Sequence, residues 1–182
     1  MKRLRVRLAL AVVAAGALAT ALVAVAIAGG GHSIREKLTG YQEAPVVSST
    51  GVGKFRASID RSANEIHYRL SYAGLESPAT QSHIHFENRT NAGPIVVFLC
   101  TNLGNGPAGT QACPANGGTI TGTIRPADVG AGAAANGIAA GEFNELVRAI
   151  RAGATYVNVH TTGHPAGEIR AQLEQNKHGD ED

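Results

Sequence analysis

The sequence is short of cysteine, and its two cysteines are not arranged as metal ligands. Only Cys100 and Cys113 occur in 182 residues, and no histidine lies between or beside them. A cysteine–histidine zinc site would need more thiols or imidazoles at close spacing. The pair instead brackets the Gly-, Pro- and Asn-rich segment 101–112. This arrangement predicts a local disulfide, formed in an oxidising compartment.

Motifs of the common enzyme classes are also absent from the sequence. It has no Gly-rich loop of the kind that holds phosphate groups, and no serine or cysteine nucleophile with a matching base. No pair of carboxylates is placed for general acid and base chemistry. These absences favour a binding or structural protein over an enzyme.

An excess of one charge is missing as well. The chain has 16 basic and 14 acidic residues, which gives a net charge of +2. Four of the basic residues and none of the acidic ones lie in residues 1–28, so the remainder has 12 basic and 14 acidic residues and a net charge of −2. Nucleic-acid-binding domains are usually strongly basic on one face. Nucleic acid is therefore not expected as a partner.

Residues 1–28 have the pattern of a secretory signal. Four basic residues precede an uncharged apolar stretch, 8–28, which ends in Ala-Ile-Ala. This stretch of 21 residues is also long enough to span a bilayer as an uncleaved anchor. Its alanine content and its small-residue end favour cleavage, and no cysteine is present there to carry a lipid. In both cases the body of the protein is expected outside the cytoplasm, secreted or at the cell surface.

Alternating apolar and polar residues dominate the remaining chain. In residues 54–60 and 65–72 every second side chain is apolar, and the turn-forming sequence RSAN lies between them, which predicts a β-hairpin. Short antiparallel strands separated by Gly- and Asn-rich turns are typical of an all-β sandwich or barrel. Further strands are expected at 94–100, 117–125, 156–161 and 168–174.

One segment, 142–152, has helical periodicity instead. Its apolar residues recur at the i, i+3, i+4 and i+7 positions of an amphipathic helix. Glutamates near its start and arginines near its end complement the helix dipole, and Gly153 can end it. We therefore expect one short helix in an otherwise β protein.

The most informative polar residues are histidines. His83 and His85 lie in the strand-like sequence SHIHFEN, on the same side of the extended chain and about 6.6 Å apart along it, with Ile84 on the other side. His160 alternates with the core valines of YVNVH, so it is expected to face outward like the pair, and His164 follows in a turn. The histidines could form a polar, hydrogen-bonding stripe that faces solvent. Alternatively, they could converge on one metal ion.

The sequence from LTGYQEAPVV through SHIHFEN to YVNVHTTGHPAGEIRAQL resembles the CHRD (chordin) domain over residues 36–174. Such domains occur in secreted animal proteins that antagonise growth factors and, as single domains, in exported bacterial proteins of undefined role. The resemblance implies a Greek-key antiparallel β-sandwich, and it brings no established reaction with it.

SHIHFEN and VNVH are also similar to the copper-binding strands of Cu/Zn superoxide dismutases. The likeness implies His83, His85 and His160 as copper-type ligands. The place of His164 in the following turn makes it a possible fourth ligand. No histidine lies between His85 and His160, so the bridging and zinc ligands of those enzymes are missing. This departure excludes a dinuclear enzyme and leaves a mononuclear copper or zinc site. Three neutral imidazoles suit either ion.

Together these observations predict four segments and one candidate site. The segments are a signal peptide or membrane anchor (1–28), a linker (29–35), a CHRD domain (36–174) and a disordered tail (175–182). The expected function is that of an exported binding or structural module, whose partner is an unidentified extracytoplasmic protein or small ligand. The membrane would be contacted only through an uncleaved N-terminal segment. The alternative is a mononuclear copper or zinc protein with dismutase-like or metal-handling activity, in which Asn158, Glu87 and Glu168 accept hydrogen bonds from the ligands.

Overall fold

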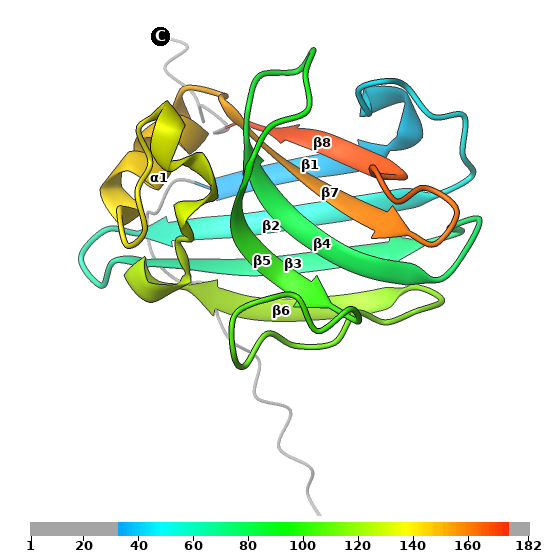
Figure 1. Ribbon diagram of the computed structural model, residues 1–182, viewed down its shortest axis with the longest axis horizontal. Coiled ribbons are helices and arrows are strands. Elements are labelled where there is room, and N and C mark those ends of the chain that lie inside the picture. The colour runs from blue at the N-terminus through cyan, green and yellow to red at the C-terminus, as the bar shows by residue number, and fades with distance from the viewer. Residues whose placement is uncertain (1–32, 175–182) are drawn as a thin grey trace, which may run out of the picture.

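The computed structural model describes residues 33–174, and these residues form a β-structure with short helical segments at both ends, η1 lying at the opposite end from the others (Figure 1). The strands are β1 (Ser33–Thr39), β2 (Val52–Asp60), β3 (Glu65–Ala73), β4 (Ala79–Phe86), β5 (Ile95–Thr101), β6 (Gly118–Ile124), β7 (Thr155–Thr161) and β8 (Ile169–Leu173). The helical segments are η1 (Gly40–Gln42), η2 (Pro126–Asp128), η3 (Ala131–Asn136) and α1 (Phe143–Arg151).

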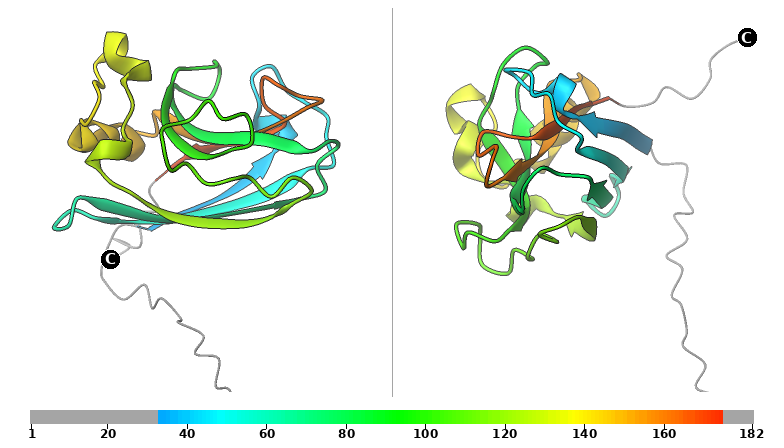
Figure 2. Two further views of the ribbon diagram at one scale, coloured as in Figure 1. Left: turned by 60° about the horizontal axis from the view of Figure 1, so that its bottom comes forward. Right: turned by 90° about the vertical axis from the view of Figure 1, so that its right-hand side faces the viewer.

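The strands form one antiparallel sheet in the order β5-β4-β7-β8-β1-β2-β3-β6. The sheet curls until its two edge strands, β5 and β6, approach each other, which gives the nearly closed sandwich seen in Figure 2. The Tyr68 hydroxyl and the Gln111 side chain bridge this seam, and both donate to the carbonyl of Leu99 at 3.2 Å. The predicted all-β Greek-key fold is therefore confirmed.

The interior of the sandwich is filled by the apolar positions of the alternating strands. In β2 and β3 every second residue is buried, and Phe55 and Leu70 lie directly opposite each other in the core. Ile84 of β4 pairs with Val157 of β7, and both are buried on the same face. The period of two in the sequence thus translates directly into one apolar layer.

The helix α1 occupies Phe143–Arg151, so the prediction of a helix at 142–152 is confirmed. Its apolar stripe is buried against the end of the sandwich, while Glu145 in the first turn pairs with Arg148 on the exposed side. The chain leaves the helix at Gly153, whose φ of 68° lies in the left-handed region that favours glycine.

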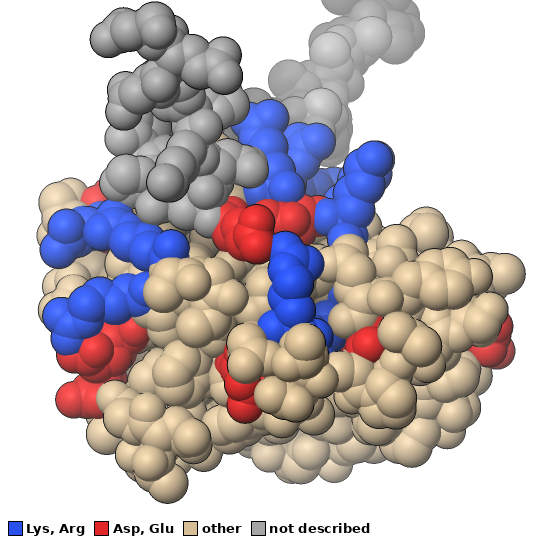
Figure 3. Space-filling view, turned by 90° about the horizontal axis from the view of Figure 1, so that it is seen from above, with Lys and Arg blue, Asp and Glu red and all other residues tan. Residues whose placement is uncertain are grey.

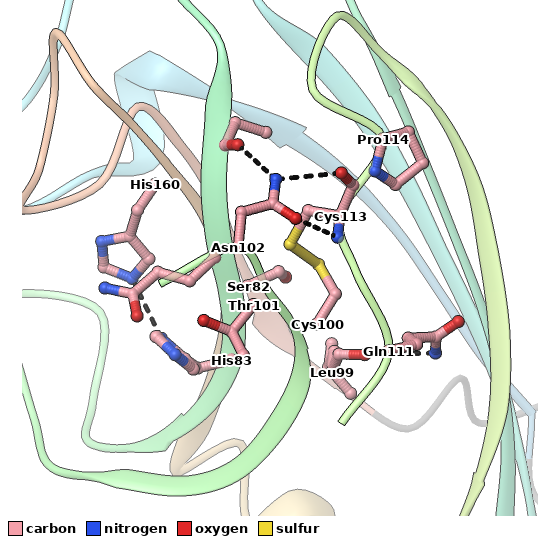
Figure 4. The surroundings of a disulfide bond; sticks show 12 residues. Ser82, His83, Leu99, Cys100, Thr101, Asn102, Gln111, Cys113, Pro114 and His160 are labelled. Carbon is pink, nitrogen blue, oxygen red and sulfur yellow. Dashed lines mark hydrogen bonds between the residues drawn. A yellow bond between two sulfur atoms is a disulfide. The ribbon is translucent and has the colours of Figure 1, made fainter. Parts of the chain in front are cut away.

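A disulfide joins Cys100 to Cys113, as predicted, and closes the segment 101–112 into a loop (Figure 4). Asn102 stabilises the same loop, because its amide nitrogen donates to the carbonyls of Ala79 and Cys113 at 2.9 and 3.0 Å. Its amide oxygen accepts from the backbone N–H of Cys113 at 3.0 Å. The loop is thereby fixed to the start of β4, which carries the histidine pair.

Three expectations concern the ends of the chain. Strand β1 begins at Ser33, inside the segment 29–35 that was expected to be a linker, so regular structure starts earlier than predicted. The predicted signal or anchor (1–28) and the predicted tail (175–182) lie outside the described residues. Among residues 33–174, none of the helices has the length and apolarity needed to cross a membrane.

We predict that removing the disulfide lowers the stability of the fold. In the Cys100→Ala/Cys113→Ala variant, the free energy of unfolding should fall by about 3 kcal/mol, because a loop of this length is no longer closed in the unfolded chain. Urea denaturation measures this difference. The wild-type protein under reducing conditions should lose a similar amount, and a loss below about 1 kcal/mol in both would contradict the prediction.

Candidate metal centre

The three predicted ligands His83, His85 and His160 meet on one face of the β4–β7 strand pair. Each of them offers a nitrogen, and these nitrogens all lie within 4.8 Å of one another. His83 Nδ1 and His160 Nε2 are 3.2 Å apart, and Figure 4 shows their rings facing each other from neighbouring strands. The ring centroids of His83 and His85 are 5.4 Å apart.

The cluster is buried, and the prediction that it faces solvent is wrong. His83 is 0% exposed, and His85 and His160 are each 6% exposed. The expected strand alternation does hold, since Ile84 and Val159 lie in the apolar core while the imidazoles lie on the opposite face. That opposite face is itself covered by loops, so its polar side chains are also removed from water.

Backbone carbonyls fix the protonated nitrogens of two of the rings. His85 Nδ1 donates to the carbonyl of Gly93 at 2.8 Å, and His160 Nδ1 donates to that of Pro165 at 3.0 Å. A carbonyl oxygen can only accept, so Nδ1 carries the proton in both rings and Nε2 carries a lone pair. His160 Nε2 then accepts from His83 Nδ1, which leaves the lone pair of His83 on its own Nε2.

Two of these lone pairs have no partner. His83 Nε2 and His85 Nε2 are buried polar atoms without a hydrogen-bond partner among the described residues. Buried nitrogens of this kind are rare, because the energy of their lost hydration is not recovered. They are also the atoms with which a neutral imidazole binds a metal ion.

Burial keeps all three imidazoles neutral. It lowers the pKa of His83 to about 2, and the neighbouring His160 and His85 lower it further. Burial also lowers the pKa of His85, to about 4, against the opposing effect of the Gly93 hydrogen bond. The pKa of His160 is lowered for the same reason. An incoming metal ion would therefore displace no proton from His83 or His85 at neutral pH.

Aromatic and cationic side chains surround the cluster. His85 stacks in parallel on Tyr156, with ring centroids 4.6 Å apart, and the Arg170 guanidinium carbon lies 3.4 Å from the centroid of the Tyr156 ring. Phe98 contacts His83 edge to face, with ring centroids 4.4 Å apart. These contacts restrict ring rotation and exclude water from one side of the site.

The remaining predicted site residues have different positions. His164 is not in the cluster, and its Nε2 instead lies 3.1 Å from the carboxylate of Glu76. Glu168 is fully buried, but its oxygens accept from Ser49, from the backbone of Glu76 and from Thr161. The Glu87 carboxylate accepts from the backbone N–H of Asn88.

Asn158 lies beside the cluster, directly opposite His83 in the β4–β7 register, and is 1% exposed. Its Oδ1 has no hydrogen-bond partner among the described residues. The acceptors that do hold the ligand rings, the carbonyls of Gly93 and Pro165, belong to the backbone. Backbone groups leave no signal in the sequence, so pattern reasoning could not have found them.

These features define an all-β domain with a buried cluster of three histidines. The sequence model of the CHRD domain matches residues 34–173, which is most of the chain, so the protein belongs to the CHRD-domain family. A search of curated proteins found no significant match, and a search of solved structures found none either.

The lowered pKa values predict how stability depends on pH in the metal-free protein. The unfolded chain protonates His85 near pH 6.5, whereas the folded chain does so only near pH 4. Its contribution is therefore fully present above about pH 6.5 and is lost as the pH falls towards about 4. As the pH falls from about 6 to about 5, one such imidazole should lower the free energy of unfolding by about 1.4 kcal/mol per pH unit.

The variant His85→Gln isolates this contribution. Glu43, whose pKa burial raises to about 7, has an effect of opposite sign, but it is common to both proteins and cancels in the comparison. Urea denaturation at several pH values should show a shallower decline for His85→Gln than for the wild type. Equal slopes would show that the folded state does not disfavour protonation of this ring.

Proposed function

We propose that the protein is an exported CHRD-domain binding module that holds one copper or zinc ion with His83, His85 and His160. Membership of the CHRD family supports a structural or binding role, and the family and the disulfide both favour a location outside the cytoplasm. The observation that carries the metal proposal is the pair of buried, unpartnered Nε2 atoms within a group of three neutral imidazoles.

The geometry requires only a small adjustment to bind an ion. Two nitrogens bonded to one copper or zinc ion at about 2.0–2.1 Å cannot be more than about 4.2 Å apart. One nitrogen of each ring lies within 4.8 Å of those of the other two, so the three need to move by less than about 1 Å. His160 Nε2 gives up its hydrogen bond with His83 Nδ1 when it binds the ion. Small changes in the side-chain torsion angles supply such a movement. Between the two ions, three imidazoles give copper(II) the higher intrinsic affinity.

Because the three rings are buried, the site favours binding of a metal ion over catalysis at that ion. A redox reaction with a small substrate needs an open coordination position that the substrate can reach. None of the three rings is more than 6% exposed. Metal handling or structural stabilisation by the ion therefore fits the site better than dismutase-like catalysis.

Metal titration tests this proposal. The purified protein, freed of metal and dialysed, should bind one equivalent of copper(II) and, more weakly, one of zinc(II), as measured by calorimetry. His83→Ala, His85→Ala and His160→Ala should each weaken binding by more than about 100-fold, because each removes a direct ligand. Electron paramagnetic resonance of the copper form should show coupling to three nitrogens.

Two controls are matched to these variants. His67→Ala and His164→Ala remove imidazoles that hydrogen-bond elsewhere, to Thr123 and to Glu76, and should leave the affinity unchanged. All proteins should start at residue 29, as after cleavage of the predicted signal, and carry His32→Ala, because a histidine near a free amino terminus can bind copper by itself. Circular dichroism shows whether each variant is folded. Absence of stoichiometric metal, or equal losses in the control variants, would refute the proposal.

A further inference from the structure

A pocket of 720 Å³ lies outside the histidine cluster, between the loop that follows η1 and the loop that joins β4 to β5. Both loops rise at the top of Figure 1. The volume is in the range of pockets that bind small organic ligands. None of the three clustered histidines lines it. The residues used below are Tyr41, Glu43, Pro45, Val46, Arg89 and Arg170.

Arg170, in the wall of this pocket, is a buried cation without a close anion in the part of the chain that the structure describes. It is 1% exposed, and no carboxylate oxygen among residues 33–174 lies within 4.0 Å of its guanidinium. Its Nη1 and Nη2 donate to the carbonyls of Asn91 and Asn88 at 3.0 and 2.7 Å. These dipoles compensate the charge only in part, and a buried charge without a counter-ion is costly.

Glu43 is the acidic residue of the pocket, and it does not neutralise Arg170 fully. Its side chain is 7% exposed, and burial raises its pKa to about 7 despite the opposing effect of Arg170. Near neutral pH it is therefore protonated in a substantial fraction of molecules. Its Oε1 is turned inward against Gly167, where a Cβ atom would collide with it. Two arginines and one acidic residue, Glu43, therefore line the pocket.

The rim of the pocket combines a second cation with apolar surface. Arg89 is 57% exposed and pairs with the equally exposed Glu174. Tyr41 and Val46 are 69% and 70% exposed, which is high for large apolar side chains, and Pro45 lies between them. Basic side chains gather on the face of the molecule seen from above, with acidic side chains among them (Figure 3).

We propose that this pocket binds a small organic carboxylate. The carboxylate is held between Arg170 and Arg89, and its apolar body lies against Tyr41, Pro45 and Val46. The exposed Arg89 suits direct contact, because its planar fork matches the two oxygens of a carboxylate. Arg170, whose Nη atoms already donate to Asn88, Asn91 and Gln172, contributes its charge. The ligand completes the charge compensation that the backbone carbonyls leave unfinished. The proposal does not depend on metal binding, because the pocket and the histidine cluster share no lining residue.

Nuclear magnetic resonance titrations of the full chain at pH 8, with metal and chelator dialysed away, test the proposal. The probes are benzoate, its neutral isostere benzamide, and inorganic phosphate. Benzoate should bind at least about tenfold more tightly than benzamide and should shift the signals of residues 89–92. Equal affinities for benzoate and benzamide, or binding of phosphate as tight as that of benzoate, would overturn the proposal.

Three variants locate the binding. Arg89→Gln should weaken benzoate binding by about fivefold, because it removes one of two cations near the anion. Arg125→Gln is the matched control: Arg125 is 56% exposed and also pairs with a glutamate, Glu65, but it does not line the pocket. It should leave the affinity unchanged. Glu43→Gln should tighten benzoate binding by about threefold at pH 8, because it removes a nearby negative charge.

The opposite signs of these effects make the experiment decisive. Equal weakening by Arg89→Gln and Arg125→Gln would indicate a general effect of net charge and refute the site. Weaker benzoate binding in Glu43→Gln would show that Glu43, and not the arginines, contributes favourably to binding. This result would also contradict the proposal. Loss of metal binding in any of these proteins has no bearing on the outcome, since the measurements are made without metal.

Discussion

The structure depends on one constraint, which is that β4 and β7 are buried on both faces. Alternation along an extended chain sends Ile84, Val157 and Val159 into the apolar core, and it necessarily sends the residues between them to the other side. If that side faced water, the histidines and Asn158 would be an ordinary polar surface. Because it is covered, every polar atom there needs a partner within the protein.

Polar residues in and just before β8 hold in place the loops that cover the outer face of β4 and β7. Arg170 and Gln172 donate to the backbone carbonyls of the loop 87–91, and Gln172 also donates to the carbonyl of Gly153. Glu168, just before β8, receives three hydrogen bonds that fix the segments around Ser49, Glu76 and Thr161. These side chains satisfy the backbone groups of irregular segments that are packed against the sheet. The loops in turn supply the carbonyl of Gly93 that orients His85.

The features that the sequence could predict are those with a local or periodic signal. The period of two identified the strands and the core side of Ile84, and the period of 3.6 identified α1. The position of Cys100 and Cys113 around one loop predicted their disulfide. Each of these patterns is contained in a short stretch of chain and reflects a rule of backbone geometry.

The sequence could not predict the environment of the histidines. Whether a polar strand face meets water depends on loops from distant parts of the chain, and loops have no periodic pattern. Glu168 was expected to accept a hydrogen bond from one of the metal-ligating histidines, but its carboxylate instead accepts from three donors in other segments. His164 lies four residues after His160, yet the turn that contains it directs its ring to Glu76.

On this covered face, the Nε2 lone pairs of His83 and His85 have no hydrogen-bond partner among the described residues. Each buried, unpartnered nitrogen costs about 1–3 kcal/mol, a considerable part of the stability of a small domain. Apolar residues of similar size would fill the same space without this cost. A second face built only for packing would therefore not need two unpartnered imidazoles. Coordination of an ion by these nitrogens, as proposed, would satisfy them, and the loops that cover this face would then keep water and competing ligands away from the ion.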